Sequence, residues 1–130
     1  MAYKYYNPNP SSLRVGDCIV RAISIFLNQT WNETYVDVCR KGYALKDMPS
    51  SNNVWMSYLE ENGCSKNIIR STCKNCYSVK NFCTDYPTGI YLLCTGTHAV
   101  TVVNGNYYDT WDSGDEIPIL YFVKEESNGL

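Results

Sequence analysis

The dipeptide Asn104-Gly105 constrains the fold of this chain more than any other feature of its sequence. Asparagine followed by glycine is a preferred pair for a two-residue hairpin turn, because both residues tolerate a positive φ. The run 99–103 before the pair is rich in valine, and the run 106–111 after it is rich in aromatic residues. Both runs are typical of strands, and two more are expected over 90–95 and 117–123. The last third of the chain therefore predicts an antiparallel sheet.

The residues before this sheet have helical patterns instead. The apolar set between Ile19 and Leu27 predicts a first helix over 17–27. The spacing of Thr30 and Glu33 is that of a capping box, so we expect a second helix over 31–41 that stops at Gly42. A third helix is expected over 54–62, and Ser78 is a candidate cap for a short fourth one.

Helices first and strands afterwards indicate an α+β fold. At 130 residues the chain is expected to form a single domain. We divide it into an extended lead-in (1–12), a mainly helical half (13–86), an antiparallel sheet half (87–124) and a polar tail (125–130).

Composition excludes several classes of function. The net charge is -2 and no basic cluster is present, which argues against a nucleic-acid partner. No apolar run is long enough for a membrane span or an export signal, so we expect a cytoplasmic protein without a membrane partner. Seven cysteines, an odd number, argue against a complete disulfide framework.

One of these cysteines stands at the predicted start of the first helix, in the stretch Gly16-Asp17-Cys18. Asp17 is a good candidate N-cap, because its carboxylate can accept hydrogen bonds from the free amides of the first turn. Those amides and the positive end of the helix dipole favour a thiolate at Cys18, and the thiolate is the reactive form. The alternative is that Cys18 is an ordinary buried side chain.

The only histidine of the chain, His98, stands at the head of the strand that enters the hairpin. Asp109 lies on the returning strand, where its carboxylate can reach the imidazole and fix the tautomer. Asp112 is the rival for this role, although its place beside Gly114 favours a turn cap. A Cys–His–Asp set in one small domain indicates nucleophilic catalysis.

The order of these residues resembles that of the papain-like cysteine peptidases. His98-Ala99-Val100, a glycine hairpin and Asp109-Thr110-Trp111 are similar to the family's histidine strand and its Asn-Ser-Trp segment. The resemblance implies that Asp109 replaces the orienting Asn and that Trp111 shields the His98–Asp109 pair. The C39-like peptidases are the nearest named branch. The Gly-Asp-Cys helix start and the Tyr-Tyr-Asp-Thr-Trp-Asp segment also look like those of small uncharacterised bacterial and phage proteins.

The chain departs from the family pattern at the oxyanion hole. The family has a glutamine six residues before the nucleophile, and this position is Ser12 here. We therefore expect the Cys18 amide to supply one donor, with Ser12, Asn9 or Asn7 as candidates for the second. Trp111 and Asp112 are candidates to line the substrate groove.

A second group of cysteines has partial metal-site spacing. Cys73 and Cys76 form a C-x-x-C pair, whereas Cys64 and Cys83 are solitary. These four residues are candidate zinc ligands, and idle or buried thiols are the alternative.

Taken together, the residues predict a thiol hydrolase that cleaves a peptide or isopeptide bond through a thioester acyl-enzyme. Cys18 is the expected nucleophile, His98 the acid and base, and Asp109 the residue that orients His98. This chemistry needs no cofactor, and the expected partner is a peptide or protein substrate in a bacterial cell or in the cytoplasm of a phage host. The alternatives are a weakly active or inactive binding module and a thiol-dependent acyltransferase or amidase.

Overall fold

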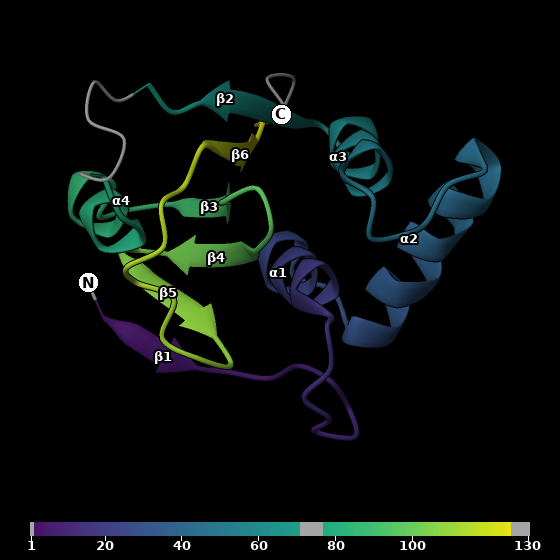
Figure 1. Cartoon of the computed structure of the whole chain (residues 1–130), viewed down its shortest axis with the longest axis horizontal. Helices are drawn as coiled ribbons and strands as arrows, with labels where there is room; N and C mark the ends of the chain where they lie inside the picture. Colours follow the sequence, from purple (N-terminus) through teal and green to yellow (C-terminus); the bar gives the residue numbers. More distant parts are fainter. Residues whose placement is uncertain (1, 71–76, 126–130) are drawn as a thin grey trace, which may run out of the picture.

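A computed structural model of the chain describes residues 2–70 and 77–125 (Figure 1). The longest helix in these ranges has 15 residues, and none is long and apolar enough to cross a bilayer. The helices are α1 (Cys18–Leu27), α2 (Trp31–Leu45), α3 (Asn52–Glu61) and α4 (Val79–Asp85). The strands are β1 (Tyr3–Tyr5), β2 (Cys64–Ile68), β3 (Ile90–Cys94), β4 (Ala99–Val103), β5 (Asn106–Asp109) and β6 (Leu120–Lys124).

The six strands form one sheet in the order β1-β5-β4-β3-β6-β2. β1 pairs with β5 in parallel, while the other pairs are antiparallel. The fold is therefore α+β, as expected, but the sheet is mixed. The predicted division into a helical half and a sheet half is also too simple, because β1 comes from the lead-in and β2 from the segment predicted to be mainly helical. Both are edge strands whose residues lack a clear apolar alternation.

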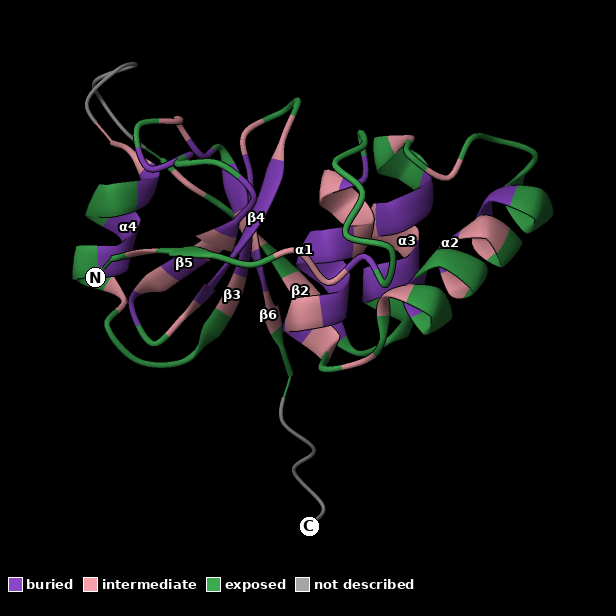
Figure 2. Ribbon diagram, turned by 90° about the horizontal axis from the view of Figure 1, so that it is seen from below, coloured by how far each residue is buried: buried purple, intermediate pink, exposed green. Residues whose placement is uncertain are grey.

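Helices cover the two faces of the sheet unequally. In Figure 2 the helices α1, α2 and α3 lie on one side of the strands, and α4 lies on the other. Each face has its own apolar core. The core under α1–α3 includes Ile23, Val54, Trp55, Leu59 and Phe122, and the core under α4 includes Val79, Phe82, Leu93, Val102 and Tyr107.

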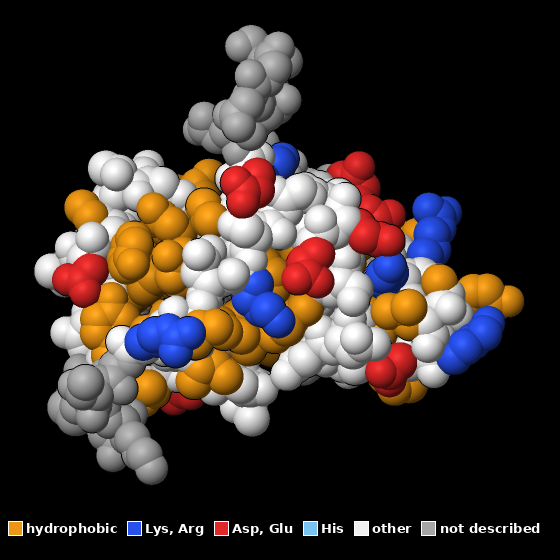
Figure 3. All heavy atoms as spheres, turned by 90° about the horizontal axis from the view of Figure 1, so that it is seen from above, with side chains coloured by type: hydrophobic (Ala, Val, Ile, Leu, Met, Phe, Trp, Pro, Cys, Tyr) orange, Lys and Arg blue, Asp and Glu red, His pale blue; other side chains and the backbone are white. Residues whose placement is uncertain are grey.

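Tyrosines complete the smaller core. Tyr86, Tyr91 and Tyr121 surround the fully buried ring of Phe82, with ring centroids 4.1, 5.4 and 5.2 Å from it. They are half-buried, which suits side chains with an apolar ring and a polar tip. Figure 3 shows apolar side chains gathered on the α4 side of the molecule, while most acidic ones on that face lie towards α2 and α3.

Several predicted local signals are confirmed. Thr30 and Ser78 each form a capping box at the start of a helix. Asn104 and Gly105 have φ values of 49° and 78° and join β4 to β5, as the hairpin signal predicts. The first helix begins at Cys18 and ends at Leu27.

The predicted end of the second helix at Gly42 is wrong, because α2 continues to Leu45. Gly42 is buried inside the helix, and a Cβ there would lie 2.8 Å from the backbone oxygen of Asp47 and 3.3 Å from the backbone nitrogen of Pro49. Glycine is thus required by the loop that folds back onto α2. The helix ends instead at Lys46, which takes the left-handed conformation.

A buried hydrogen bond fixes α1 against the sheet. The Thr101 hydroxyl donates to the carbonyl of Ala22 over 2.6 Å, and both residues are almost completely buried. Because Thr101 lies in the centre of β4, this contact holds the helix that begins at Cys18 against the strand that follows His98.

We predict that Gly42→Ala lowers the free energy of unfolding, although alanine ordinarily stabilises a helix interior by about 1 kcal/mol over glycine. The close approach of Asp47 and Pro49 should outweigh this gain and give a net loss of about 1–2 kcal/mol in urea denaturation. Ala44→Gly lies at an exposed position of the same helix. It therefore measures the difference in helix propensity between alanine and glycine without the steric contact. A stabilised Gly42→Ala variant would contradict this explanation.

Candidate active site

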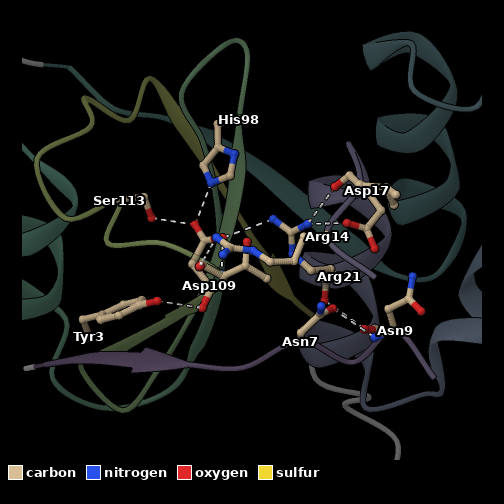
Figure 4. A network of polar contacts seen from close by, with 12 residues as sticks. Tyr3, Asn7, Asn9, Arg14, Asp17, Arg21, His98, Asp109 and Ser113 are labelled. Carbon is tan, nitrogen blue, oxygen red and sulfur yellow. Dashed lines mark hydrogen bonds and ion pairs between the residues drawn. The ribbon is translucent and has the colours of Figure 1, made fainter. Parts of the chain in front are cut away.

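Three elements bring Cys18, His98 and Asp109 together. Cys18 is the first residue of α1, His98 immediately precedes β4, and Asp109 is the last residue of β5. A tight turn positions His98, because the Thr95 amide donates to the His98 carbonyl over 2.9 Å and Gly96 has a φ of 102°. Figure 4 shows the imidazole pointing towards the carboxylate of Asp109.

The carboxylate of Asp109 occupies one ring nitrogen of His98. Nε2 lies 2.6 Å from Oδ2 of Asp109, and His98 lines the same cavity as Cys18. The carboxylate thus sets the orientation of the ring and leaves Nδ1 for the sulfur.

These contacts shift both pKa values towards a charged pair. Burial alone would raise the pKa of the Cys18 thiol, but the hydrogen bonds with His98 and the Ala99 amide and the nearby charges of His98 and Arg21 lower it overall. Burial would lower the pKa of His98, but the hydrogen bonds and charges of Asp109 and Cys18 raise it to about 9. Both shifts favour the charged pair of a thiolate and an imidazolium.

The carboxylate of Asp109 is kept ionised by four donors, although it is 2% exposed. Oδ2 accepts from His98 and, over 2.7 Å, from the Ser113 hydroxyl. Oδ1 accepts from the Thr110 amide over 2.8 Å and from Arg21 over 3.2 Å. Burial raises the pKa of Asp109, but these hydrogen bonds and the charge of His98 bring it below its usual range.

Arg21 is a residue of this site that the sequence analysis missed. It lies on the first turns of α1, is 6% exposed, and forms ion pairs with both Asp17 and Asp109 (Figure 4). An arginine four residues after an aspartate is a common helix pair, so the sequence indicates the contact with Asp17. The sequence contains no pattern that indicates the contact of Arg21 with Asp109.

Asp17 takes the N-cap position but does not cap the helix with its side chain, so that part of the expectation is wrong. One carboxylate oxygen binds Arg21, and the other accepts a hydrogen bond of 2.9 Å from the Trp31 indole. Competition from these two donors explains the missing cap. Asp17 instead ties the start of α2 to the start of α1.

Cys18 and His98 face a cavity of about 660 Å³. Asn9 also lines it, and its Oδ1 accepts a hydrogen bond from the Ser11 amide, which leaves its NH₂ group as the available donor. Ser12, the position of the family's glutamine, is exposed and does not line the cavity. The side chain of Asn7 donates to the Leu13 carbonyl. Of the candidate second oxyanion donors, Asn9 is therefore the one that lines the same cavity as Cys18.

Trp111 and Asp112 do not line this cavity. The Trp111 ring lies against His98, with centroids 4.8 Å apart, and is 42% exposed, so it covers part of the imidazole. The carboxylate of Asp112 accepts from the Tyr107 hydroxyl and the Gly114 amide. Asp112 is thus a turn-capping residue, and the groove role predicted for Trp111 and Asp112 stays a prediction.

The four candidate zinc ligands are not brought together by the described residues. Cys64 belongs to the core under α1–α3 and Cys83 to the core under α4, on opposite faces of the sheet. Burial raises the pKa of both thiols, which disfavours the thiolate that zinc needs. Cys73 and Cys76 lie outside the described residues. Within residues 2–70 and 77–125 no group of three or more metal-ligating side chains is present.

The sole histidine makes the central pair directly measurable. We predict that the imidazole of His98 titrates near pH 9 in NMR spectra. Asp109→Asn should lower this pKa by about one unit or more, because it removes the negative charge that favours the imidazolium. Asp112→Asn, the matched control three residues away, should leave it unchanged. Equal shifts in the two variants would refute the assignment of Asp109.

Comparison of the chain with models of known protein families, with curated proteins and with solved structures gave no significant match. No family is therefore assigned to this chain. Its function is inferred from the contacts among Cys18, His98 and Asp109 and from the cavity that Cys18 and His98 face.

Proposed function

We propose that the protein is a thiol hydrolase that cleaves a peptide, isopeptide or related acyl bond through a Cys18 thioester. The observation that carries this proposal is the His98–Asp109 pair, with 2.6 Å between Nε2 and Oδ2, at a cavity that both Cys18 and His98 line. Cys18 lies at a helix N-terminus, and the cavity is large enough for a substrate. A papain-like origin would explain the same order of residues.

In the proposed reaction the Cys18 thiolate attacks the carbonyl carbon of the substrate. The carbon–sulfur bond forms, and the carbonyl electron pair moves onto the oxygen. His98 then donates its proton to the leaving amine, the carbon–nitrogen bond breaks, and a thioester remains. His98, now neutral, takes a proton from water as the hydroxide attacks the thioester. The products are a carboxylic acid, an amine and the original thiolate–imidazolium pair.

The oxyanion formed in this reaction needs donors beside Cys18. First-turn backbone amides of α1 have no intrahelical acceptor, so the amide of Cys18 is suited to this role. The NH₂ group of Asn9 is the proposed second donor, since Asn9 lines the cavity with Cys18. The oxyanion hole would then use an asparagine from the lead-in in place of the family's glutamine.

Transfer of the acyl group to an acceptor other than water is the second candidate function. Apolar residues that include Ile19, Val38 and Trp55 line the cavity beside Cys18. Such a lining excludes water and would prolong the life of a thioester. Product analysis in the presence of an amine or thiol acceptor separates transfer from hydrolysis. In a binding module without activity, Cys18 would instead react as an ordinary thiol.

The proposal predicts that iodoacetamide alkylates Cys18 rapidly well below pH 7, because the imidazolium of His98 stabilises the thiolate. Labelling followed by peptide mass spectrometry should slow at least tenfold at pH 6 in His98→Ala. Cys39, a partly exposed thiol that lines the same cavity, reports on access to the reagent. If Cys18 is labelled only with an ordinary thiol pKa of about 8.5, the enzyme proposal is wrong.

Asn9 offers a test of the oxyanion hole that is separate from thiol activation. Asn9→Ala should lower the kcat for ester hydrolysis by about 10²-fold, with the alkylation rate of Cys18 unchanged. The reason is that alkylation by iodoacetamide develops no oxyanion. Ser12→Ala, in the same lead-in, is the control, because Ser12 is exposed and does not line the cavity. Equal losses of hydrolysis in both variants would remove Asn9 from the proposed hole.

A further inference from the structure

The cavity beside Cys18 is apolar and almost without charge. Its ionisable lining residues include Asp17 and His98, and the carboxylate of Asp17 is already paired with Arg21. Within residues 2–70 and 77–125, no lysine, arginine or glutamate lines it. Its walls consist largely of aliphatic and aromatic side chains, which include Ile19, Val20, Trp31, Tyr35, Val38 and Trp55.

Most of the residues that line the cavity come from the helical side of the molecule. The His98 side contributes only residues from 94 to 99, whereas the other walls come from 9–20, 31–39 and 49–55. In Figure 1 these latter segments belong to the side of α1, α2 and α3. Because His98 must protonate the leaving group, the leaving group lies on the His98 side. The acyl group therefore occupies the larger apolar part.

The entrance is apolar as well. Leu13, Val15 and Tyr35 line the cavity and are 55%, 52% and 49% exposed. Apolar side chains that remain this exposed beside a cavity are expected where a ligand covers them. A polar or charged acyl group would gain nothing from these contacts and would lose its hydration.

We propose that the acyl group of the substrate is a bulky, uncharged apolar group of about six to ten carbons, held between α1, α2 and α3. This inference rests on the proposed function, because it takes Cys18 as the nucleophile. A medium-length aliphatic acyl chain and a large apolar amino-acid residue share this chemistry. The cavity volume of about 660 Å³ is sufficient for either.

The first test compares p-nitrophenyl esters that differ only in the acyl group. Each buried methylene is worth roughly fourfold in binding, so kcat/KM for the octanoate should exceed that for the acetate by at least about 100-fold. The N-acetylphenylalanine and N-acetylglycine esters form the second pair. A preference seen only for the octanoate indicates that the natural acyl group is an aliphatic chain. A preference seen only for the phenylalanine ester indicates that it is part of a peptide. Ratios below about threefold in both pairs would overturn the proposal.

A substitution in the wall tests whether this cavity is the site. Ser50 lines the cavity from an exposed loop position. The indole of Ser50→Trp should fill part of the cavity. It should therefore lower the ratio of the kcat/KM values, in the ester pair that shows a preference, at least tenfold. Met48 lies two residues earlier, is 68% exposed and does not line the cavity, so Met48→Trp should leave the ratio unchanged. Equal ratios in the two variants would place the binding site elsewhere.

A binding measurement separates failure of this proposal from failure of the enzyme proposal. In Cys18→Ala, octanamide or N-acetylphenylalaninamide should change the fluorescence of Trp31 and Trp55 saturably, whereas acetamide should not. If Cys18 reacts rapidly with iodoacetamide but neither apolar amide binds, the cavity proposal fails and the enzyme proposal stands. If an apolar amide binds but Cys18 is an ordinary thiol, the apolar site stands and the enzyme proposal fails.

Discussion

The buried carboxylate of Asp109 is the constraint on which the rest of the site depends. An isolated carboxylate in such a place would cost several kcal/mol or become protonated. Here its oxygens accept hydrogen bonds from His98, Arg21, Ser113 and the Thr110 amide. One charge thus joins the end of β5, the turn before β4, the first turns of α1 and the loop after β5. The helix that carries Cys18 and the strand that follows His98 are held in register by the same group.

The sequence was most informative where a signal is local. The hairpin turn at Asn104 depends on two adjacent residues and the capping box at Thr30 on four, and both were predicted correctly. Ser78 was predicted as a helix cap, and it forms a capping box with Asn81. Proximity of His98 and Asp109 also follows from local information, because the hairpin brings β4 and β5 together. The position of Cys18 relative to that pair is different. It was expected from a family resemblance, since no local pattern joins residues that far apart in the chain.

The features that were missed depend on distant contacts. From the sequence alone, Arg21 is expected on the exposed surface of a helix. Its ion pair with Asp109 forms only because the fold brings β5 beside α1. Gly42 resembles a helix stop, and only the return of the loop at Asp47 and Pro49 explains a glycine inside the helix. β1 has three residues and obtains its partners from β5, about a hundred positions later. None of these contacts leaves a periodic pattern in the sequence.

The parallel pairing of β1 with β5 has a consequence for synthesis of the chain. The ribosome releases the lead-in and the helix of Cys18 long before it releases the hairpin that provides His98 and Asp109. Until then β1 has no strand to join, and the thiol has neither the imidazole nor the amide of Ala99 as a partner. The side chains that lower the pKa of Cys18 thus come together only after most of the chain has emerged.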